Sequence, residues 1–419
     1  MTVHIIGAGL AGLACAITVL ESGRRVIVYE MAGQAGGRCR SFYDSKLERF
    51  LDNGTHLILS ANTRTVEYIN SLHCNRFFTI IAPAVFPFLD LTNGERWTLQ
   101  PSGGRFPWWL MHPKRRVASS RLSDYWSVYR LWGWGSRKRG GGVTVADCLA
   151  GPLMRRLWQP LTEAMLNTEP EAASAALLAK VLSNSLMRGE GACRPYLAHH
   201  GLGPALIDPA IHKITSKGGI IRFSNLLRGI STVGKILRLH FETGIVETAR
   251  GDSVVLALPP WRLTTLWPGL AIPTSFRAIV NVHYRLDRPI QLPGGWPFLA
   301  VIGGLAQWLF VRGDVLSVTV SAANTLTTLD STVIAQQVWT DCASILKHCI
   351  TKVPPARVVK EKRATLAHTP AADYRTIPLP PFPRLVLAGD WTCSHLPNTI
   401  EAAITSGVRA AAQVLEHTL

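Results

Sequence analysis

The first thirty residues alternate between apolar runs and an alanine-rich stretch, a pattern that predicts regular structure. Residues 3–6 form a short apolar run typical of a strand buried in a parallel sheet. Residues 13–22 have the composition of a helix, and residues 25–30 form a second apolar run. The pattern therefore predicts a strand–helix–strand unit, the repeating unit of an α/β fold.

The loop between the first predicted strand and the helix contains a G-x-G-x-x-G motif. In such a loop Gly7 permits a tight turn, and Gly9 lets the backbone approach a pyrophosphate. Gly12 allows the helix to pack close to the strand, and the phosphates would lie at the positive N-terminal end of that helix. The predicted nucleotide-binding residues of this segment are Gly7, Gly9, Leu10, Ala11 and Gly12.

An acidic residue follows where such motifs bind the ribose. Glu30 ends the second predicted strand about 20 residues after the glycines, where a carboxylate accepts hydrogen bonds from the adenosine ribose 2′-OH. The same carboxylate would repel a 2′-phosphate, which disfavours NADP. A chance cluster of glycines in a turn is the competing interpretation, but it does not account for strand, helix, strand and acid occurring in register.

Further motifs at both ends of the chain carry a resemblance to a known family. Gly36 and Gly37 allow a tight turn just after Glu30, and the guanidinium of Arg38 can bind a pyrophosphate. A surface arginine after a glycine turn is the alternative interpretation. Together with DNGTH at 52–56, AGDWT at 388–392 and TIEAA at 399–403, this layout resembles the FAD-dependent amine oxidase and carotenoid desaturase superfamily. Within it, the chain most resembles the hydroxysqualene dehydroxylases of bacterial hopanoid synthesis.

The resemblance implies one bound FAD and an α/β fold, in which a Rossmann-like FAD-binding domain carries an inserted α+β substrate-binding domain. The FAD-binding domain is expected to comprise residues 1–75, 201–265 and 370–419, and the substrate domain residues 76–200 and 266–369. Arg38 contacts FAD in the resembled family, and backbone groups near Leu227 would pair with the adenine edge. Since no second dinucleotide motif occurs in the sequence, reducing electrons would come from an external donor.

The AGDWT motif is expected to follow a strand at the flavin site. Residues 384–388 are predicted to form a short buried strand that ends at Gly389 and Asp390. The carboxylate of Asp390 can hydrogen-bond the ribityl hydroxyls of a flavin. A plain turn residue is the alternative interpretation.

The TIEAA motif is expected to begin a helix that points at the flavin. Residues 399–416 are predicted to form an amphipathic helix with Asn398 as its N-cap. The positive end of this helix, at Thr399 and Ile400, would face the flavin N1/O2 locus. Negative charge develops there when a flavin is reduced, so the helix dipole would stabilise it.

The apolar runs in the second half of the sequence predict strands that form the floor of a substrate cavity. Residues 277–286, 298–311 and 316–320 alternate or run apolar as strands do, and residues 332–348 are predicted to form a helix. Walls made of such residues suit a hydrocarbon.

The resemblance implies a reaction, the reductive removal of a hydroxyl from hydroxysqualene to give squalene. The allylic C–O bond would ionise to a carbocation, which takes a hydride from reduced FAD. His56, with Asp52 near it, is the candidate proton donor, although a core histidine bonded to the backbone is an equal alternative. A desaturase of a carotenoid or another polyprenyl precursor is the second enzyme class, and a flavin-binding scaffold or redox sensor is the non-enzymatic alternative. An amine oxidase is disfavoured, because no carboxylate in the expected pocket wall would attract an ammonium.

The composition is apolar and basic at once. Hydrophobic residues make up 47% of the 419 residues, which excludes a disordered chain. The formal net charge is +17, although charged residues amount to only 17%, against roughly 25% in ordinary soluble proteins.

The eight cysteines form no C-x-x-C pair, which predicts reduced thiols of an intracellular protein and no metal site. The apolar N-terminus lacks the basic region of a secretory signal.

One region concentrates aromatic and basic side chains. The aromatic residues are Trp97, Phe106, Trp108, Trp109, Tyr125, Trp126, Tyr129, Trp132 and Trp134, and the basic residues are Arg105, Lys114, Arg115, Arg116, Arg121, Arg130, Arg137, Lys138 and Arg139. The mixture predicts a peripheral patch that binds an anionic membrane and admits an isoprenoid substrate, which would place the protein on the cytoplasmic side of a bacterial inner membrane. A core of aromatics beneath a solvated basic face is the competing interpretation. Nucleic acid is disfavoured, because no RNP, KH or OB pattern occurs.

Overall fold

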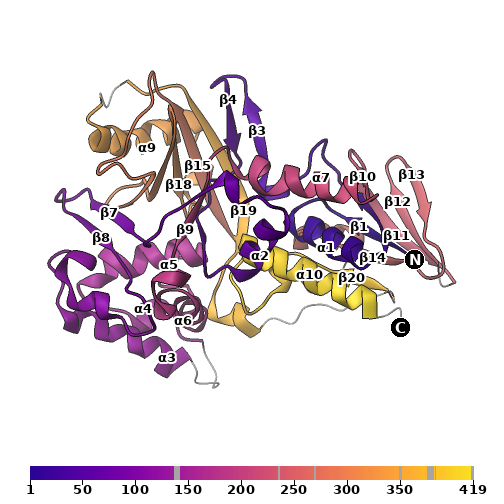
Figure 1. The fold of residues 1–419 in the computed structure, drawn as a ribbon, viewed down its shortest axis with the longest axis horizontal. Coiled ribbons are helices and arrows are strands. Elements are labelled where there is room, and N and C mark those ends of the chain that lie inside the picture. The colour runs from indigo at the N-terminus through magenta and orange to yellow at the C-terminus, as the bar shows by residue number, and fades with distance from the viewer. Residues whose placement is uncertain are drawn as a thin grey trace.

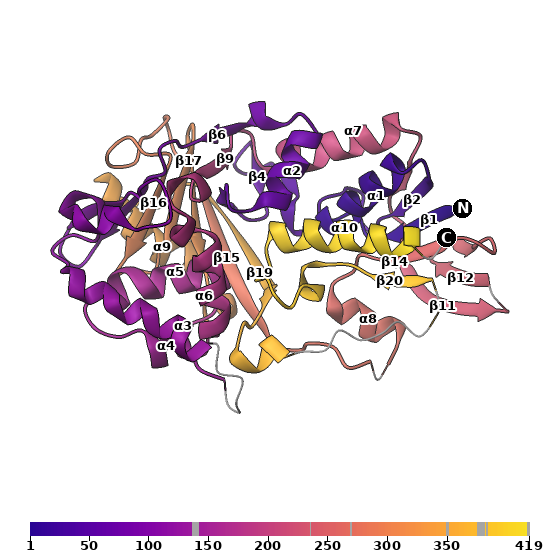
Figure 2. The same cartoon turned by 60° about the horizontal axis from the view of Figure 1, so that its bottom comes forward.

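Two main β-sheets stand side by side in the molecule (Figure 1). The structure is a computed structural model of the chain and describes residues 1–135, 142–234, 236–268, 270–348, 352–374, 382 and 384–416. The N-terminus and the last helix, α10 (Ile400–Glu416), lie beside the first sheet (Figure 2). The predicted α/β class is confirmed.

The first sheet is parallel throughout and has the strand order β10-β2-β1-β14-β20. Its strands are β1 (Thr2–Ile6), β2 (Arg25–Tyr29), β10 (Ile220–Arg222), β14 (Ser253–Leu256) and β20 (Leu385–Leu387). Ile5 of β1 lies opposite Val28 on one side and Val255 on the other. The apolar run at residues 3–6 is buried because β1 has neighbours on both edges and is covered on its faces.

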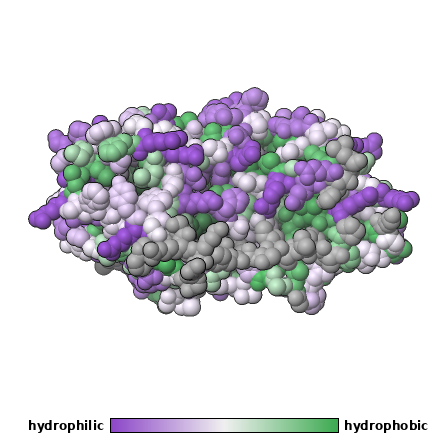
Figure 3. Space-filling view, turned by 90° about the horizontal axis from the view of Figure 1, so that it is seen from below, coloured by the Kyte–Doolittle hydropathy of each residue, from purple (hydrophilic) through white to green (hydrophobic). Residues whose placement is uncertain are grey.

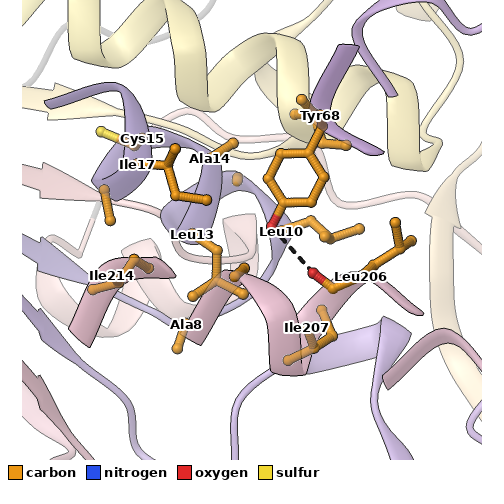
Figure 4. Packing of buried hydrophobic residues seen from close by; sticks show 14 of the residues in the cluster. Ala8, Leu10, Leu13, Ala14, Cys15, Ile17, Tyr68, Leu206, Ile207 and Ile214 are labelled. Atoms are coloured by element: carbon orange, nitrogen blue, oxygen red, sulfur yellow. Dashed lines mark hydrogen bonds between the residues drawn. The ribbon is translucent and has the colours of Figure 1, made fainter. Parts of the chain in front are cut away.

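Helices pack against this first sheet. They are α1 (Leu10–Glu21), α7 (Asp208–Ser216) and α10 (Ile400–Glu416), and α2 (Thr63–Ser71) packs against α10 in the same hydrophobic cluster. In Figure 4, Leu10, Leu13 and Cys15 of α1 belong to the same packed cluster as Ile214 of α7. The Tyr68 hydroxyl of α2 donates a hydrogen bond of 3.2 Å to the carbonyl of Leu206, so its one polar atom is satisfied inside the core.

A close contact joins α1 and α10, the helices that begin at the two predicted flavin motifs. A Cβ added to Gly407 of α10 would lie 2.1 Å from the carbonyl oxygen of Ala11. Only glycine therefore allows these backbones to approach as they do. This contact brings the N-terminal ends of both helices to the same side of the sheet.

The second sheet has seven strands in the order β19-β15-β18-β17-β16-β7-β8. Its strands are β7 (Phe86–Asp90), β8 (Arg96–Leu99), β15 (Phe276–Arg285), β16 (Phe298–Ile302), β17 (Trp308–Arg312), β18 (Val315–Val320) and β19 (Ala356–Leu366). All neighbouring strands are antiparallel except β16 and β7. One face packs against α9 (Ser331–Leu346), through a cluster that includes Val280 and Trp339. The other face packs against helical segments within residues 108–135 and 142–188.

Smaller elements connect the two halves. The helices α3 (Tyr129–Gly135), α4 (Val145–Cys148), α5 (Gln159–Leu166) and α6 (Ala175–Asn184) lie on the face of the second sheet opposite α9. Helix α8 (Pro260–Leu266) follows β14. The remaining strands are β3 (Ser41–Asp44), β4 (Arg49–Asp52), β5 (Ile58–Leu59), β6 (Phe78–Ile80), β9 (Pro195–Ala198), β11 (Leu227–Val233), β12 (Ile236–Phe241) and β13 (Gly244–Glu247). In the three-stranded sheet β5-β9-β6, the strand β9 pairs with both β5 and β6, and this sheet lines the smaller of the two cavities described below.

Two expectations about single elements are wrong. The apolar run 298–311 is two strands, β16 and β17, because the chain turns at Gly303, whose φ of 82° is left-handed. Asn398 is not the N-cap of α10, since its side-chain oxygen accepts a hydrogen bond from the backbone N–H of Leu366. The hydroxyl of Thr399 accepts the N–H of Ala402 instead and caps the helix.

Candidate active site

The glycine motif forms a turn with free space in front of it. Gly7 has a φ of 105°, and a Cβ there would lie 2.5 Å from the carbonyl oxygen of Ala257. A Cβ on Gly12 would lie 1.9 Å from the carbonyl oxygen of Gly7, so α1 sits directly against the loop. A Cβ on Gly9, by contrast, would meet nothing within 4 Å. The loop is therefore closely packed at Gly7 and Gly12 and has free space at Gly9. This free space fits a pyrophosphate at the N-terminal end of α1.

Glu30 is held at the edge of this open space. Its Oε2 accepts a hydrogen bond of 2.8 Å from the N–H of Ala8, and its Oε1 accepts one of 2.9 Å from the N–H of Ala32. Both bonds fix the carboxylate in one orientation. Each carboxylate oxygen can accept a further hydrogen bond, as binding two ribose hydroxyls requires.

The second glycine pair lies directly against the first motif. The N–H of Gly36 donates to the carbonyl of Ala8 at 2.9 Å, and Gly36 forms an isolated bridge with Gly9. Gly36 and Gly37 both have left-handed backbones, with φ of 107° and 54°. These conformations explain why glycines occur at both positions, and they place Arg38 beside the loop.

Arg38 and Asp390, 352 positions apart in the chain, form an ion pair of 2.7 Å. A second nitrogen of Arg38 donates to the carbonyl of Ala364. Burial opposes the charge on Arg38, but the adjacent carboxylate of Asp390 outweighs it and raises the pKa of the guanidinium. Arg38 therefore keeps its charge, and the ion pair orients two of the predicted cofactor residues toward each other.

A cavity of about 690 Å³ collects most of the predicted site residues. The predicted residues in its lining are Gly7, Gly9, Leu10, Ala11, Glu30, Gly36, Gly37, Arg38, His56, Leu227, Gly389, Asp390, Thr399 and Ile400. Gly12 lies beneath the loop, and Asp52 lies outside this cavity. The space and its donors fit FAD, since an open glycine loop, two helix N-terminal ends and a fixed ribose acceptor face the same cavity.

One end of the cavity is apolar and extends over the second sheet. Its wall includes Leu161 and Met165 of α5, Ile279 of β15, and Trp308 and Phe310 of β17. Residues two apart on one strand face the same side, which is why Trp308 and Phe310 both reach the cavity. The expectation that strands of this sheet floor a cavity is confirmed.

His56 lies where the apolar end meets the flavin end. Its Nδ1 donates to the carbonyl of Gly54 at 2.8 Å, which leaves the lone pair on Nε2. Nε2 makes no hydrogen bond with any residue that the structure describes. Burial lowers the pKa of His56, although Asp52 and the Gly54 carbonyl oppose that effect. At neutral pH His56 is therefore an uncharged imidazole with a free acceptor nitrogen.

Asp52 supports the segment that carries His56. Its Oδ1 accepts hydrogen bonds from the Ser41 hydroxyl at 2.6 Å and from the N–H of Leu202 at 2.9 Å. Its Oδ2 lies 3.0 Å from a guanidinium nitrogen of Arg312 on β17. The buried carboxylate thus ties β4 to β17 and to the chain after β9.

Two residues that the sequence analysis missed also hold this site. Asn281 of β15 donates to the carbonyl of Asn53 at 3.4 Å and accepts from the Thr319 hydroxyl at 2.8 Å. The carboxylate of Glu401 accepts the N–H groups of Arg64 and Thr65, at the start of α2. Asn281 had a visible signal, since it is the one polar residue within the apolar run 278–282 of β15.

The described residues contain no group of three or more histidine, cysteine, aspartate or glutamate side chains that could hold a metal ion. In the same residues no helix combines the length and the apolar character needed to cross a membrane.

A comparison with known protein families decides the kind of protein. The sequence profile of flavin containing amine oxidoreductases matches residues 10–127 and 136–415. The chain belongs to this family. It is an FAD-dependent oxidoreductase. Its cofactor fits the cavity lined by the open glycine loop, by Glu30 and by the Arg38–Asp390 pair.

Curated relatives narrow the position of the chain within the family. It is 38% identical to a hydroxysqualene dehydroxylase of Sinorhizobium fredii, covering 99% of both chains. It is 39% identical to a hydroxysqualene dehydroxylase of Rhodopseudomonas palustris, covering 99% of this chain and 98% of the relative. A 15-cis-phytoene desaturase of Synechococcus elongatus is 22% identical, with 99% and 96% covered. The chain therefore groups with the hydroxysqualene dehydroxylases.

Solved structures show the same fold. Cyclohexylamine oxidase from Brevibacterium oxydans matches with a TM-score of 0.72 at 14% identity, covering 99% of both chains. Wild-type putrescine oxidase bound to putrescine matches with a TM-score of 0.68 at 16% identity, also covering 99% of both.

Proposed function

We propose that the protein removes the hydroxyl group of hydroxysqualene by reduction and so produces squalene. The observation that carries this proposal is the identity of 38 and 39% to two hydroxysqualene dehydroxylases over nearly the whole of each chain. The apolar end of the cavity supports it, because a long hydrocarbon with one hydroxyl needs apolar walls and few polar groups.

The reaction exchanges a C–O bond for a C–H bond. The hydroxyl takes up one proton and leaves as water, while the allylic carbon carries positive charge until it receives a hydride. Reduced FAD, when bound, supplies that hydride. The chain's own residues then have three tasks, which are to hold the isoprenoid, to assist the departure of the hydroxyl and to exclude water from the cation.

His56 is the residue that meets the hydroxyl in this proposal. In its neutral form the free Nε2 accepts a hydrogen bond from the hydroxyl and so positions the oxygen. In its protonated form Nε2–H donates a proton to the departing oxygen. Asp52 acts through its neighbours rather than on the substrate, since its oxygens are bound to Ser41, Leu202 and Arg312.

The apolar walls protect the positively charged carbon. Leu161, Met165, Ile279, Trp308 and Phe310 carry no hydroxyl, amine or carboxylate that would trap the cation, and their apolar surface disfavours ordered water beside the isoprenoid. A cation formed there would survive until hydride transfer. Electrons reach the flavin from an external donor in this proposal, since the sequence has a single dinucleotide motif.

Product analysis tests the proposal. Purified protein loaded with FAD and reduced by dithionite under anaerobic conditions is incubated with hydroxysqualene, and the products are identified by mass spectrometry. We expect squalene to form. A parallel incubation of the oxidised protein with phytoene examines the second enzyme class, and a desaturated product there together with no squalene would replace the proposed function with a desaturase.

We further propose that the protein binds an anionic membrane from the cytoplasmic side. Phe106, Trp108, Met111, Trp126 and Tyr129 have side chains that are 56–68% exposed. The exposed basic residues around them are Arg105, Lys114, Arg115, Arg121 and Arg130. We call these ten residues the aromatic-basic patch. Exposed tryptophan at a headgroup boundary and basic residues near anionic lipid, each worth about 1 kcal/mol, favour peripheral binding.

The structure divides the aromatic residues of this region. Trp97, Trp109 and Tyr125 are buried in the core beside the second sheet, as the competing interpretation expects. The side chains of Trp134, Arg137, Lys138 and Arg139 lie outside the described residues. Seen from the side of α3 in Figure 1, the surface mixes green and purple residues rather than presenting one continuous apolar face (Figure 3). Such a mixed surface supports binding at a headgroup layer.

A further inference from the structure

A second, smaller cavity lies on the far side of His56. It has a volume of about 220 Å³ and shares Thr55, His56 and Phe310 with the main cavity. We call it the side chamber. Its polar lining consists of Asp52, Thr55, His56, Thr79, His199 and Arg312, and the rest is apolar surface from β9, β17 and neighbouring residues.

The side chamber runs from the protein surface to the imidazole. At its outer end Thr79 of β6 and His199, just after β9, are both exposed, and the Thr79 hydroxyl lies 2.5 Å from Nε2 of His199. At its inner end is His56, whose Nδ1 is already bound to Gly54. The only nitrogen of His56 that is free to exchange a proton is therefore Nε2.

The wall between these ends is rigid and charged. The carboxylate of Asp52 and the guanidinium of Arg312 are 3.0 Å apart and join β4 to β17. A Cβ on Gly201 would lie 2.6 Å from Oδ1 of Asp52, so the chain after β9 packs tightly against the pair. This packing keeps the chamber in one shape, and its volume is large enough for several water molecules at roughly 30 Å³ each.

We propose that the side chamber is a water route between bulk solvent and His56, which delivers the proton for the departing hydroxyl and carries the released water away. The inference rests on the proposed function for its chemistry. The substrate loses a C–O bond, its oxygen leaves as water with one proton from Nε2–H of His56, and its carbon gains the hydride of reduced FAD. Water in the side chamber then returns a proton to Nε2.

This route solves a problem of the main cavity. Its apolar end must exclude water from the cation, yet each turnover consumes a proton and releases one water molecule. A separate passage that meets the main cavity at Thr55, His56 and Phe310 brings water to the hydroxyl-binding group from one side only, which meets both requirements. Charged and titratable groups around His56 along this passage are Asp52, Arg312 and His199, with Arg38 on the flavin side.

The experiment closes the mouth of the side chamber with Thr79→Trp. Thr79 is exposed, so the substitution should leave folding intact. Ile80→Trp is the matched control, because Ile80 is exposed on the same strand, points to the other face and does not line the chamber. We expect Thr79→Trp to slow the single-turnover oxidation of reduced enzyme by hydroxysqualene roughly tenfold, a loss of part of the acid–base contribution. Its FAD affinity and its apparent affinity for hydroxysqualene should stay unchanged, and Ile80→Trp should match the parent protein.

A second readout does not depend on turnover. Exchange of the C2 proton of His56 is followed by mass spectrometry in D₂O, on the FAD-bound protein saturated with squalene to fill the main cavity. We expect slower exchange in Thr79→Trp than in the parent and in Ile80→Trp. Equal exchange in all three proteins would overturn the water route, and so would a raised KM with unchanged kcat, which would assign the chamber to the isoprenoid chain. Failure of the parent protein to form squalene would instead count against the proposed function, and the exchange result would still decide the route.

Discussion

His56 forms a hydrogen bond through one ring nitrogen and leaves the other open, where the main cavity meets the side chamber. This position explains why burial lowers its pKa even though Asp52 is close. A lowered pKa makes the neutral form the resting state at neutral pH. The acid form that assists the hydroxyl therefore becomes more abundant as the pH falls.

This state of His56 predicts the pH dependence of the chemical step. As the pH falls from alkaline values toward the lowered pKa of His56, the single-turnover rate should rise, by up to about tenfold per pH unit, and should level off below that pKa. His56→Gln should remove the dependence and lower the rate by about 10²-fold. Stopped-flow absorbance of the flavin measures both. A rate that rises with pH in the parent protein would contradict an acid role.

At the residue scale, the sequence predicted what local motifs define. Gly9, Glu30, Arg38 and Asp390 belong to motifs whose chemistry depends on neighbours along the chain, and the structure brings them to one cavity. Arg312 could not be found in this way. Its place beside Asp52 results from the packing of β17 against the end of β4, which no local pattern encodes.

At the scale of elements, two glycines of the turn between β1 and α1 have different roles. Gly9 leaves space for the cofactor, and Gly12 allows α1 to pack against the loop. Gly9→Ala adds a methyl group that meets no protein atom within 4 Å, so the free energy of unfolding should change by no more than about 0.5 kcal/mol. The methyl group would occupy space needed by the pyrophosphate, so the FAD dissociation constant should rise at least tenfold. Denaturant unfolding of the apoprotein and titration with FAD measure the two effects.

Gly12→Ala is the matched variant of the same turn. Its methyl group would collide with the carbonyl of Gly7 and force α1 away from the loop. The apoprotein should lose about 1–3 kcal/mol of stability, as in overpacked cores. If Gly9→Ala destabilised the apoprotein as much as Gly12→Ala does, the space above the loop would not be a cofactor space.

Strand β15 carries a second buried histidine that affects stability rather than chemistry. His283 is fully buried, its Nδ1 lies 2.8 Å from the Ser317 hydroxyl, and burial with Arg312 nearby lowers its pKa to about 4. The unfolded chain binds a proton near the usual histidine pKa of about 6.5, whereas the folded chain does not. Stability should therefore fall as the pH drops from about 6.5 toward 4, by roughly 3 kcal/mol from this group. Asp52 and Asp44 also face His283 and weaken the effect without reversing it.

A variant isolates this contribution. In His283→Gln the loss of stability between pH 6.5 and 4 should be smaller than in the parent, as measured by denaturant unfolding at each pH. An equal loss in both proteins would show that other groups, and not His283, cause the acid sensitivity.

The elements themselves were largely predictable because their apolar runs are local. The strands β1, β2, β15, β18 and β20 and the helix α9 lie where the pattern places them. The exceptions were decided by tertiary contacts. Gly303 turns the chain in the middle of an apolar run. The side chain of Asn398 accepts a hydrogen bond from Leu366 of β19, so Thr399 caps α10 instead.

At the scale of the whole molecule, the net charge of +17 and the apolar composition have separate places in the structure. Apolar residues fill the cores beside two sheets and line the cavity, and basic residues surround exposed aromatics in the aromatic-basic patch. A long isoprenoid partitions into membranes, so an enzyme that binds the membrane surface through the aromatic-basic patch would meet its proposed substrate there.

The aromatic-basic patch predicts selective flotation with liposomes. The protein should float with anionic vesicles, less so with neutral ones, and high salt should reduce its recovery. Trp108→Ser combined with Trp126→Ser should reduce flotation, whereas Phe50→Ser, at an exposed aromatic residue on β4, should not. Equal recovery with neutral and anionic vesicles would contradict the proposed membrane surface.

The central claim is that this flavoprotein reduces hydroxysqualene by hydride transfer to carbon. The most direct measurement is anaerobic single turnover in D₂O, where the transferable hydrogen of the reduced flavin is deuterium. Hydroxysqualene is added to the reduced protein, the oxidised flavin band near 450 nm is followed, and the squalene is analysed by mass spectrometry. The account predicts one squalene per flavin oxidised, carrying one deuterium on carbon. Flavin that stays reduced, or squalene without deuterium, would contradict it.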